Sequence, residues 1–191
     1  VLKGPEGIYS PQIVTGGPRR FRFWFNGGSL STWSLRTTMR MRGRPVPVKP
    51  VFTLEPCSFL PGAVMVMTCG VFSRLGGFDE KFFLYWEDAD FCFRARAIGL
   101  RLCVVTGARV WHAVGGSGSH RALSYFYYIQ YSRAVFAALI HRGGPSVLFT
   151  AGLPQTIRPF IQAFSNRGRV GPSLLLAWRG LIDACRELGK R

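Results

Sequence analysis

The chain has 191 residues, of which 48% are hydrophobic and 18% charged, so it can bury a sizeable core and is excluded from the disordered class. Its 25 Lys and Arg residues against 9 Asp and Glu residues give a formal net charge of +16. Residues 1–54 and 121–191 each carry a net charge of +8, whereas residues 55–120 are neutral and hold six of the nine acidic residues. We therefore look for chemistry in the acidic centre.

Membrane-spanning and disulfide-rich classes are disfavoured. The longest uncharged run, residues 56–73, contains two prolines and two glycines, which would break a spanning helix. The five cysteines are odd in number and form no CxxC pair, which predicts buried free thiols in a reducing compartment rather than zinc ligands or disulfides. No signal-peptide pattern precedes the first predicted strand and the chain begins at Val1, so we expect a processed, trimmed or partial chain.

The first third of the chain is predicted to be mostly strand. β-branched and aromatic residues predict strands over residues 7–14 and 21–25, the second followed by the turn signal Asn26-Gly27-Gly28. Residues 31–50, rich in Arg, Thr and Pro, are expected to form a basic surface segment. A further strand over 52–59, a Pro61-Gly62 turn and a buried apolar segment over 63–68 follow.

The centre alternates helix and strand, which predicts an α/β layer structure. A short helix over 71–75 is expected to end at Gly76-Gly77. Residues 88–98 have the apolar spacing of a helix that ends at Gly99, with Asp90 and Arg94 paired on its exposed face. Strand-like segments then cover 101–105 and 109–111, and three helical segments with interspersed arginines follow, over residues 121–141, 146–165 and 173–188.

The densest chemistry lies in residues 76–90. Five carboxylates fall between Asp79 and Asp90, and residues 76–90 also hold five aromatic residues. Carboxylates beside aromatic surface lose solvation, which raises their pKa toward values useful to a general base. Glu87 and Asp88 also stand at a predicted helix start, where acidic residues serve as N-terminal caps. Spacing alone leaves both interpretations open.

A second candidate element is His112. It ends a predicted strand and precedes the loop of residues 115–119, the place where α/β folds contact ligands and where loop N–H groups can face phosphate. A lone histidine is more often structural, so this signal counts only together with the carboxylates.

These residues carry a family resemblance. The run from Pro61-Gly62-Ala63, through GGFDEKFFLYWEDADFCFRARAIG, to Ala108-Arg109-Val110-Trp111-His112 resembles the C-terminal half of the catalytic domain of family 2 glycosyltransferases, particularly rhamnosyltransferase- and galactofuranosyltransferase-like members. The resemblance covers about residues 7–120 and is sharpest over 61–118. It implies an α/β fold class: a partial, Rossmann-like GT-A domain over 1–120, the acceptor and base half, followed by a basic, aromatic-rich helical tail over 121–191.

The resemblance also implies an inverting enzyme with assigned residues. Asp88 would be the general base that deprotonates the acceptor hydroxyl, and Glu87 would orient it or bind acceptor. His112 would help hold a divalent metal, Mg²⁺ or Mn²⁺, at the donor diphosphate. The family's own Asp-x-Asp metal loop comes before this segment, and no such loop precedes Gly7. The substrate-binding residues would be Gly62, Ala63, Asp79 and Glu80, which shape the site, with Phe83 and Trp86 stacking on sugar faces.

The implied function is transfer of a sugar from a nucleotide-diphosphate donor to a glycan or lipid-linked glycan acceptor in cell-envelope polysaccharide synthesis. The expected location is cytoplasmic and peripheral, at the inner face of the membrane. The alternative is a non-catalytic basic module. Its partner would be an anionic membrane surface, through the arginine-rich tail, or nucleic acid, through the aromatic and basic residues 19–25. The neutral centre and the lack of a recognised nucleic-acid motif argue against nucleic acid.

Overall fold

The computed structural model describes residues 6–17, 20–49, 51–113, 122–141, 148–149, 152–166 and 168–188. The chain divides into two compact units. The sheet unit comprises Val1–Leu30, Thr37–Asp79 and Asp88–Val114, and the helical unit comprises Ser31–Arg36, Glu80–Glu87 and Gly115–Arg191. Each unit is built around its own buried side chains.

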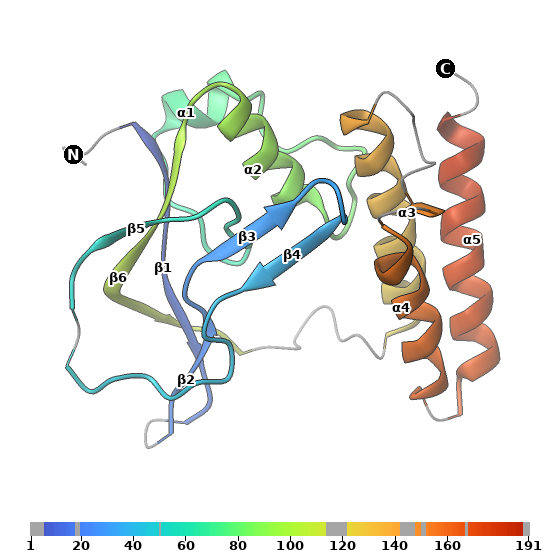
Figure 1. The fold of residues 1–191 in the computed structure, drawn as a ribbon, viewed down its shortest axis with the longest axis horizontal. Helices are drawn as coiled ribbons and strands as arrows, with labels where there is room; N and C mark the ends of the chain where they lie inside the picture. Colours follow the sequence, from blue (N-terminus) through green and yellow to red (C-terminus); the bar gives the residue numbers. More distant parts are fainter. Residues whose placement is uncertain are drawn as a thin grey trace. The chain divides into compact units, whose positions relative to one another are not determined.

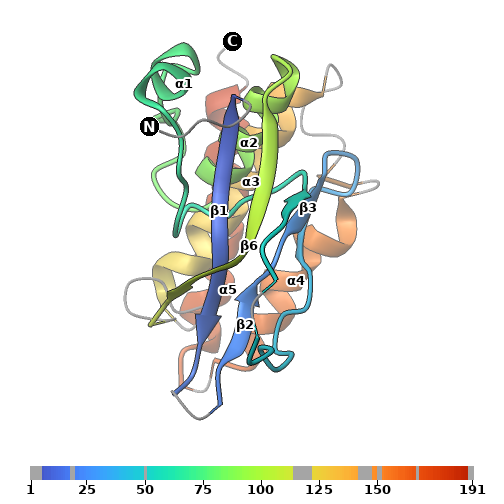
Figure 2. The same cartoon turned by 90° about the vertical axis from the view of Figure 1, so that its left-hand side faces the viewer.

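The sheet unit contains a mixed four-stranded sheet in the order β2-β1-β6-β5, and Figure 2 shows β1 and β6 side by side. The strands are β1 (Gly7–Thr15), β2 (Arg22–Phe25), β5 (Leu54–Pro56) and β6 (Arg101–Trp111). β1 runs parallel to β6, and the β1–β2 and β5–β6 pairs are antiparallel. The predicted strands over 7–14 and 21–25 are confirmed, the two predicted segments after residue 100 join into β6, and β5 is shorter than predicted. This mixed α/β architecture is consistent with a partial Rossmann-like domain.

An irregularity in the central strand pair sets the position of the end of β6. Pro11 pairs with Val105 but the next residue, Gln12, pairs with Arg109, so β6 bulges between them. Proline has no N–H to give to a ladder, and Gly107 adopts a φ of 86°, a conformation that side chains disfavour. Beyond the bulge, the strand carries the chain to His112, whose backbone N–H donates to the carbonyl of Val14 at 2.9 Å.

Two helices of the sheet unit follow the predicted pattern. α1 (Cys69–Arg74) is capped by Thr68 and ends at Gly76 and Gly77, both with positive φ. α2 (Glu87–Ala97) begins at the residue before Asp88 and is followed by Gly99 with a φ of 80°. Of the four apolar residues whose spacing predicts the helix, Phe91, Cys92 and Ala95 are buried, whereas Ile98 lies beyond its end and is 50% exposed.

The prediction that residues 63–68 are buried is wrong. Ala63, Val66 and Thr68 are exposed. The segment makes a single bridge, in which the backbone groups of Val66 and Tyr9 exchange hydrogen bonds of 2.7 and 2.9 Å. A single bridge leaves the outer side of the segment open to solvent, so an uninterrupted apolar run does not become a central strand here.

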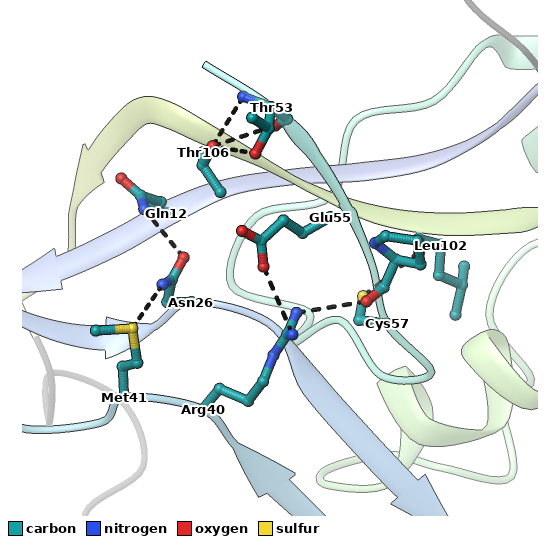
Figure 3. A network of polar contacts seen from close by, with 10 residues as sticks. Gln12, Asn26, Arg40, Met41, Thr53, Glu55, Cys57, Leu102 and Thr106 are labelled. Carbon is teal, nitrogen blue, oxygen red and sulfur yellow. Dashed lines mark hydrogen bonds and ion pairs between the residues drawn. The ribbon is translucent and has the colours of Figure 1, made fainter. Parts of the chain in front are cut away.

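The basic segment over residues 31–50 contains structure that the sequence did not predict. β3 (Gly28–Ser31) and β4 (Arg36–Met39) form a two-stranded sheet. Arg40 then forms an ion pair with Glu55 at 3.5 Å, as Figure 3 shows. In the same network Gln12 donates to Asn26, and the hydroxyls of Thr53 and Thr106 lie 2.8 Å apart. Polar side chains therefore connect the segment over residues 31–50 to β5 and the rest of the four-stranded sheet.

The helical unit consists mainly of α3 (Leu123–Ile140), α4 (Leu153–Phe164) and α5 (Val170–Leu188), which lie beside one another in Figure 1. Each helix gives one fully buried residue to a common cluster: Phe126, Ala163 and Ala177. α3 and α5 approach closely because Gly180 lies against the backbone of Tyr127, where a side chain would collide. The three helices confirm the predicted helical character after residue 120, although α4 begins later than expected, at Leu153.

Two sequence expectations, on membrane segments and on thiols, can be compared with the structure. In the part of the chain that the structure describes, no helix is both long enough and apolar enough to cross a membrane.

All five cysteines are free thiols, but Cys69 and Cys185 are exposed, so the expectation of burial is wrong for these two. Both lie on helices whose opposite faces supply the packing contacts, Val71 on α1 and Ala184 on α5.

Candidate active site

Asp88 is held at the start of α2 by two backbone N–H groups. Its Oδ2 accepts a hydrogen bond from Gly62 N at 3.1 Å, and its Oδ1 accepts one from Ala89 N at 2.8 Å. A carboxylate oxygen has more than one lone pair, so each can accept a further proton or hydrogen bond. Two candidate residues far apart in sequence, Gly62 and Asp88, are thus in direct contact within the sheet unit. Gly62 lies outside α2, so its bond to Asp88 is not a helix cap, whereas the bond from Ala89 N comes from the first turn of α2 itself.

Arg94 connects the Gly76-Gly77 loop to α2. Its guanidinium donates to the carbonyls of Leu75 and Gly77, the latter at 2.9 Å, and forms an ion pair with Asp90 at 2.7 Å. Asp90 is only 3% exposed, so the prediction that this pair lies on the exposed face of the helix is wrong. The reason is that α1 and the loop after it cover this side of α2.

Aromatic packing strengthens the same connection. The rings of Phe78 and Phe91 lie 4.7 Å apart, and the Arg94 guanidinium carbon lies 5.4 Å from the Phe91 ring centre. The loop that leads to Asp79 is therefore fixed against α2. The sequence predicts the pairing of Asp90 with Arg94 but not the bonds from Arg94 to the carbonyls of Leu75 and Gly77.

His112 packs against aromatic surface rather than among carboxylates. Its ring lies 4.9 Å from that of Trp24, edge to face, and the Arg42 guanidinium carbon lies 5.7 Å from the centre of the Trp24 ring. Among the described residues, the Trp24 indole N–H is buried without a hydrogen-bond acceptor. Trp24 belongs to the aromatic and basic segment 19–25 that the sequence offered for nucleic-acid binding, whereas the sequence analysis did not single out Arg42.

A metal ion does not fit the described residues alone. Within them, no group of three or more His, Cys, Asp or Glu side chains is placed to hold one. Mg²⁺ and Mn²⁺ require several oxygen ligands, and one imidazole against a tryptophan cannot supply them. The loop of residues 115–119, predicted to face phosphate, lies outside the described residues.

Glu87, the first residue of α2, belongs to the helical unit and is partly buried. Burial raises the pKa of its carboxyl group, partly offset by a hydrogen bond from its own backbone. Its Oε2 is buried and has no hydrogen-bond partner among the described residues. The charge of Glu87 also contributes to the raised pKa of Tyr85, after burial and the neighbouring Tyr125. A carboxylate with a raised pKa is a recognised signature of a functional site.

The two candidate sugar-stacking residues occupy different environments in the helical unit. Trp86 is 8% exposed, adopts a φ of 69° and packs its ring 5.0 Å from that of Phe136 on α3. Phe83 is 75% exposed and lies 5.1 Å from the ring of Tyr128. Phe83 and Tyr128 therefore offer open aromatic surface, whereas Trp86 anchors its loop. A sugar-stacking role for either residue stays a prediction.

The loop that carries these residues is fixed to α3. Ser132 donates from its hydroxyl to the carbonyl of Leu84 at 2.9 Å, and Tyr85 packs edge to face on Tyr125 at 5.5 Å. The remaining candidates are more open to solvent: Ala63 and Glu80 are exposed and Asp79 is half-buried.

A groove of about 520 Å³ lies elsewhere on the sheet unit. Arg20, Arg22 and Arg109 line it together with Phe21 and the apolar segment of residues 45–48. Two of the arginines also donate to backbone carbonyls, Arg22 to Gly43 and Arg109 to Pro47, each at 2.7 Å. Among the described residues that line the groove there is no carboxylate, so these residues present positive charge beside apolar surface.

Comparison with known proteins relates the chain to glycosyltransferases. No family model matches it. It is 31% identical over 89 residues to the N-acetylglucosaminyl-diphospho-decaprenol L-rhamnosyltransferase of Mycobacterium tuberculosis, covering 47% of this chain and 29% of the relative. It is 30% identical over 83 residues to the rhamnosyltransferase WbbL of Escherichia coli K12, covering 44% and 31% of the two chains. It is 37% identical over 57 residues to the low-salt glycan biosynthesis hexosyltransferase Agl10 of Haloferax volcanii, covering 29% and 19%.

These similarities are partial. The matched segments cover less than a third of the length of each of these relatives. They support a general relationship to glycosyltransferases, in agreement with the resemblance noted in the sequence, at a coarse level.

Proposed function

We propose that this chain is the acceptor and base portion of an inverting glycosyltransferase of the GT-A type. The observation that carries the proposal is the contact between Gly62 N and Asp88 Oδ2. It joins two motifs of the resemblance, Pro61-Gly62-Ala63 and Trp86-Glu87-Asp88, at the start of one helix. The similarity to two rhamnosyltransferases and a hexosyltransferase supports the same class.

In the proposed reaction Asp88 takes the proton from an acceptor hydroxyl. The acceptor oxygen then forms a bond to the anomeric carbon of the donor sugar, while the bond between that carbon and the diphosphate oxygen breaks and the nucleoside diphosphate leaves. The two backbone N–H groups fix the orientation of the Asp88 carboxylate before substrate binds, which lowers the entropic cost of reaching the reactive geometry.

Glu87 and Phe83 have supporting roles in this proposal. Glu87 would bind or orient the acceptor. Burial raises the pKa of its carboxyl group, and a perturbed pKa of this kind supports a place for Glu87 in a functional site. Phe83, with its exposed ring beside Tyr128, would stack on a sugar. The nucleotide-sugar donor, a glycan or lipid-linked acceptor, and a place at the cytoplasmic face of the membrane belong to the same proposal. A divalent ion, with His112 as one ligand, stays a prediction that enters no step above.

The substitution Asp88→Asn tests the base assignment. The introduced amide keeps one carbonyl oxygen, which can accept from Gly62 N, but its –NH2 group replaces the oxygen that accepts from Ala89 N, and the amide cannot take up a proton. Circular dichroism checks that the variant is folded. In the whole protein we expect kcat for transfer to fall about 10²–10⁴-fold, while affinity for nucleoside diphosphates, measured by calorimetry across a panel, changes less than about threefold.

Asp183→Asn provides the matched control, because it makes the same charge change on α5. It should leave transfer near the wild-type rate. Equal losses of transfer and nucleotide affinity in Asp88→Asn, or full retention of transfer, would overturn the base assignment.

One observation favours a second candidate function, binding of a polyanion. The groove lined by Arg20, Arg22 and Arg109 presents three cations without a carboxylate. If the groove binds single-stranded nucleic acid, the slope of log affinity against log salt should become shallower by about 2 in the triple Arg→Gln variant. An unchanged slope would exclude the groove as the polyanion site.

A further inference from the structure

Two helices of the helical unit present large apolar side chains to solvent. On α4 these residues are spaced by three or four positions and are 39–67% exposed: Leu153, Ile157, Ile161 and Phe164. On α5 they have the same kind of spacing and are 44–68% exposed: Leu175, Trp178 and Ile182. Spacing of this kind places each set on one face of its helix. We call the two sets together the α4–α5 face.

The two sets form one surface. α4 and α5 lie side by side in Figure 1, and the rings of Phe160 and Trp178 are 5.2 Å apart at the seam between them. The opposite faces of both helices, which include Ala163 and Ala177, already pack into the core of the unit. Single exposed apolar side chains are ordinary on protein surfaces, but seven on one continuous face mark an interaction site.

The charged side chains around this face are mainly positive. Arg158 on α4 is exposed, and the side chains of Arg179 and Arg186 on α5 are 69% and 75% exposed. Both α5 arginines share the single carboxylate of Asp183, at 3.5 and 3.7 Å, so positive charge remains in excess.

The acidic groups of α5 are engaged with α3. Tyr127 donates to Asp183 at 3.2 Å and Tyr131 donates to Glu187. The described part of residues 122–188 holds five arginines against these two acids. Apolar side chains, two aromatic rings at the seam and a rim of arginines are the composition of an interfacial surface.

We propose that the α4–α5 face docks on the surface of a bilayer rich in anionic lipid, with its apolar side chains in the headgroup boundary and its arginines on lipid phosphates. Charge complementarity selects this occupant over a second copy of the chain. A two-fold contact would bring the same arginines together, and like charges facing each other across an interface cost free energy. The proposal does not rest on the proposed glycosyltransferase function, because none of its residues belongs to the candidate active site.

Vesicle flotation tests the proposal directly. The chain is mixed with one of two kinds of vesicle, made either of phosphatidylcholine alone or of phosphatidylcholine with about 30% phosphatidylglycerol, whose anionic headgroups give the surface a negative potential. We expect the wild-type chain to float with the anionic vesicles and to be released as salt is raised. The variant I161E/W178E should lose at least about tenfold in its partition coefficient.

The matched control is V51E/I98E. Val51 and Ile98 are exposed on the sheet unit, 71% and 50%, neither lines the arginine groove, and the double substitution makes the same change in net charge. It should float like the wild-type chain. A second variant, R158Q/R186Q, leaves every apolar side chain in place and should weaken binding to anionic vesicles about fivefold for each arginine removed, with circular dichroism confirming that each variant is folded.

Three outcomes would overturn the proposal. The first is a wild-type chain that does not float with anionic vesicles. The second is an I161E/W178E variant that floats no less than V51E/I98E. The third is a wild-type chain that light scattering shows to be a dimer and that becomes monomeric only in I161E/W178E, because a second copy would then occupy the face.

Discussion

Replacing Arg94 by Met is expected to destabilise the sheet unit strongly. Methionine has similar length but cannot donate hydrogen bonds, so the substitution removes the ion pair to Asp90 and the bonds to the carbonyls of Leu75 and Gly77. The side chain of Asp90 is 5% exposed and that of Arg94 29%, so the carboxylate would lose its cation while remaining buried.

The magnitude follows from this burial. Removing one partner of a buried ion pair costs about 3–5 kcal/mol, and we take the lower end because Arg94 is partly solvated. A loss of about 3 kcal/mol corresponds to a fall in Tm of about 6–12 °C for a chain of this size. Thermal unfolding followed by circular dichroism at neutral pH measures it.

Two variants check the reasoning. Arg96→Met removes an exposed arginine from the same helix and should change stability by less than about 0.5 kcal/mol. Arg94→Met combined with Asp90→Asn removes the buried charge as well and should recover at least about 1 kcal/mol. If the Tm of Arg94→Met lies within about 2 °C of the Tm of Arg96→Met, the contacts of Arg94 with Asp90, Leu75 and Gly77 do not stabilise the sheet unit.

The remaining predictions concern the candidate site. Burial raises the pKa of Glu87 above its ordinary value of 4.5, so the protonated form is favoured in the fold and ionisation at higher pH costs stability. Glu87→Gln should therefore raise the free energy of unfolding relative to the wild-type chain at pH 7.5, and this gain should vanish below pH 4.5; an equal difference at both pH values in denaturant titrations would contradict the burial argument. In the whole protein His112→Ala should lower the affinity for the nucleotide-sugar donor when Mg²⁺ or Mn²⁺ is present but not when a chelator has removed the metal; calorimetry measures both affinities. If donor affinity depends on the metal equally in variant and wild type, His112 is not a metal ligand. Asp88→Asn and the arginine-groove variant, described above, complete the set.

Several elements were predictable from the sequence because their signals act within a few residues. The spacing of Phe91, Cys92 and Ala95 and the stop at Gly99 define α2, and the alternation of residues 21–25 before a glycine turn defines β2. The carboxylates at the start of α2 were visible for the same reason. Glycine stops and apolar periods depend on backbone conformation, which neighbouring residues largely set.

Other features depend on which faces meet in the folded chain, and only the tertiary structure decided them. The parallel pairing of β1 with β6 joins segments that lie at opposite ends of the sheet unit's sequence. Asp90 is buried because α1 and its loop cover that side of α2, and Trp86 is buried because Phe136 of α3 lies against it. Burial and partners of this kind come from long-range packing, which no local pattern encodes; the same physics left Ala63, Val66 and Thr68 exposed although they belong to an apolar segment.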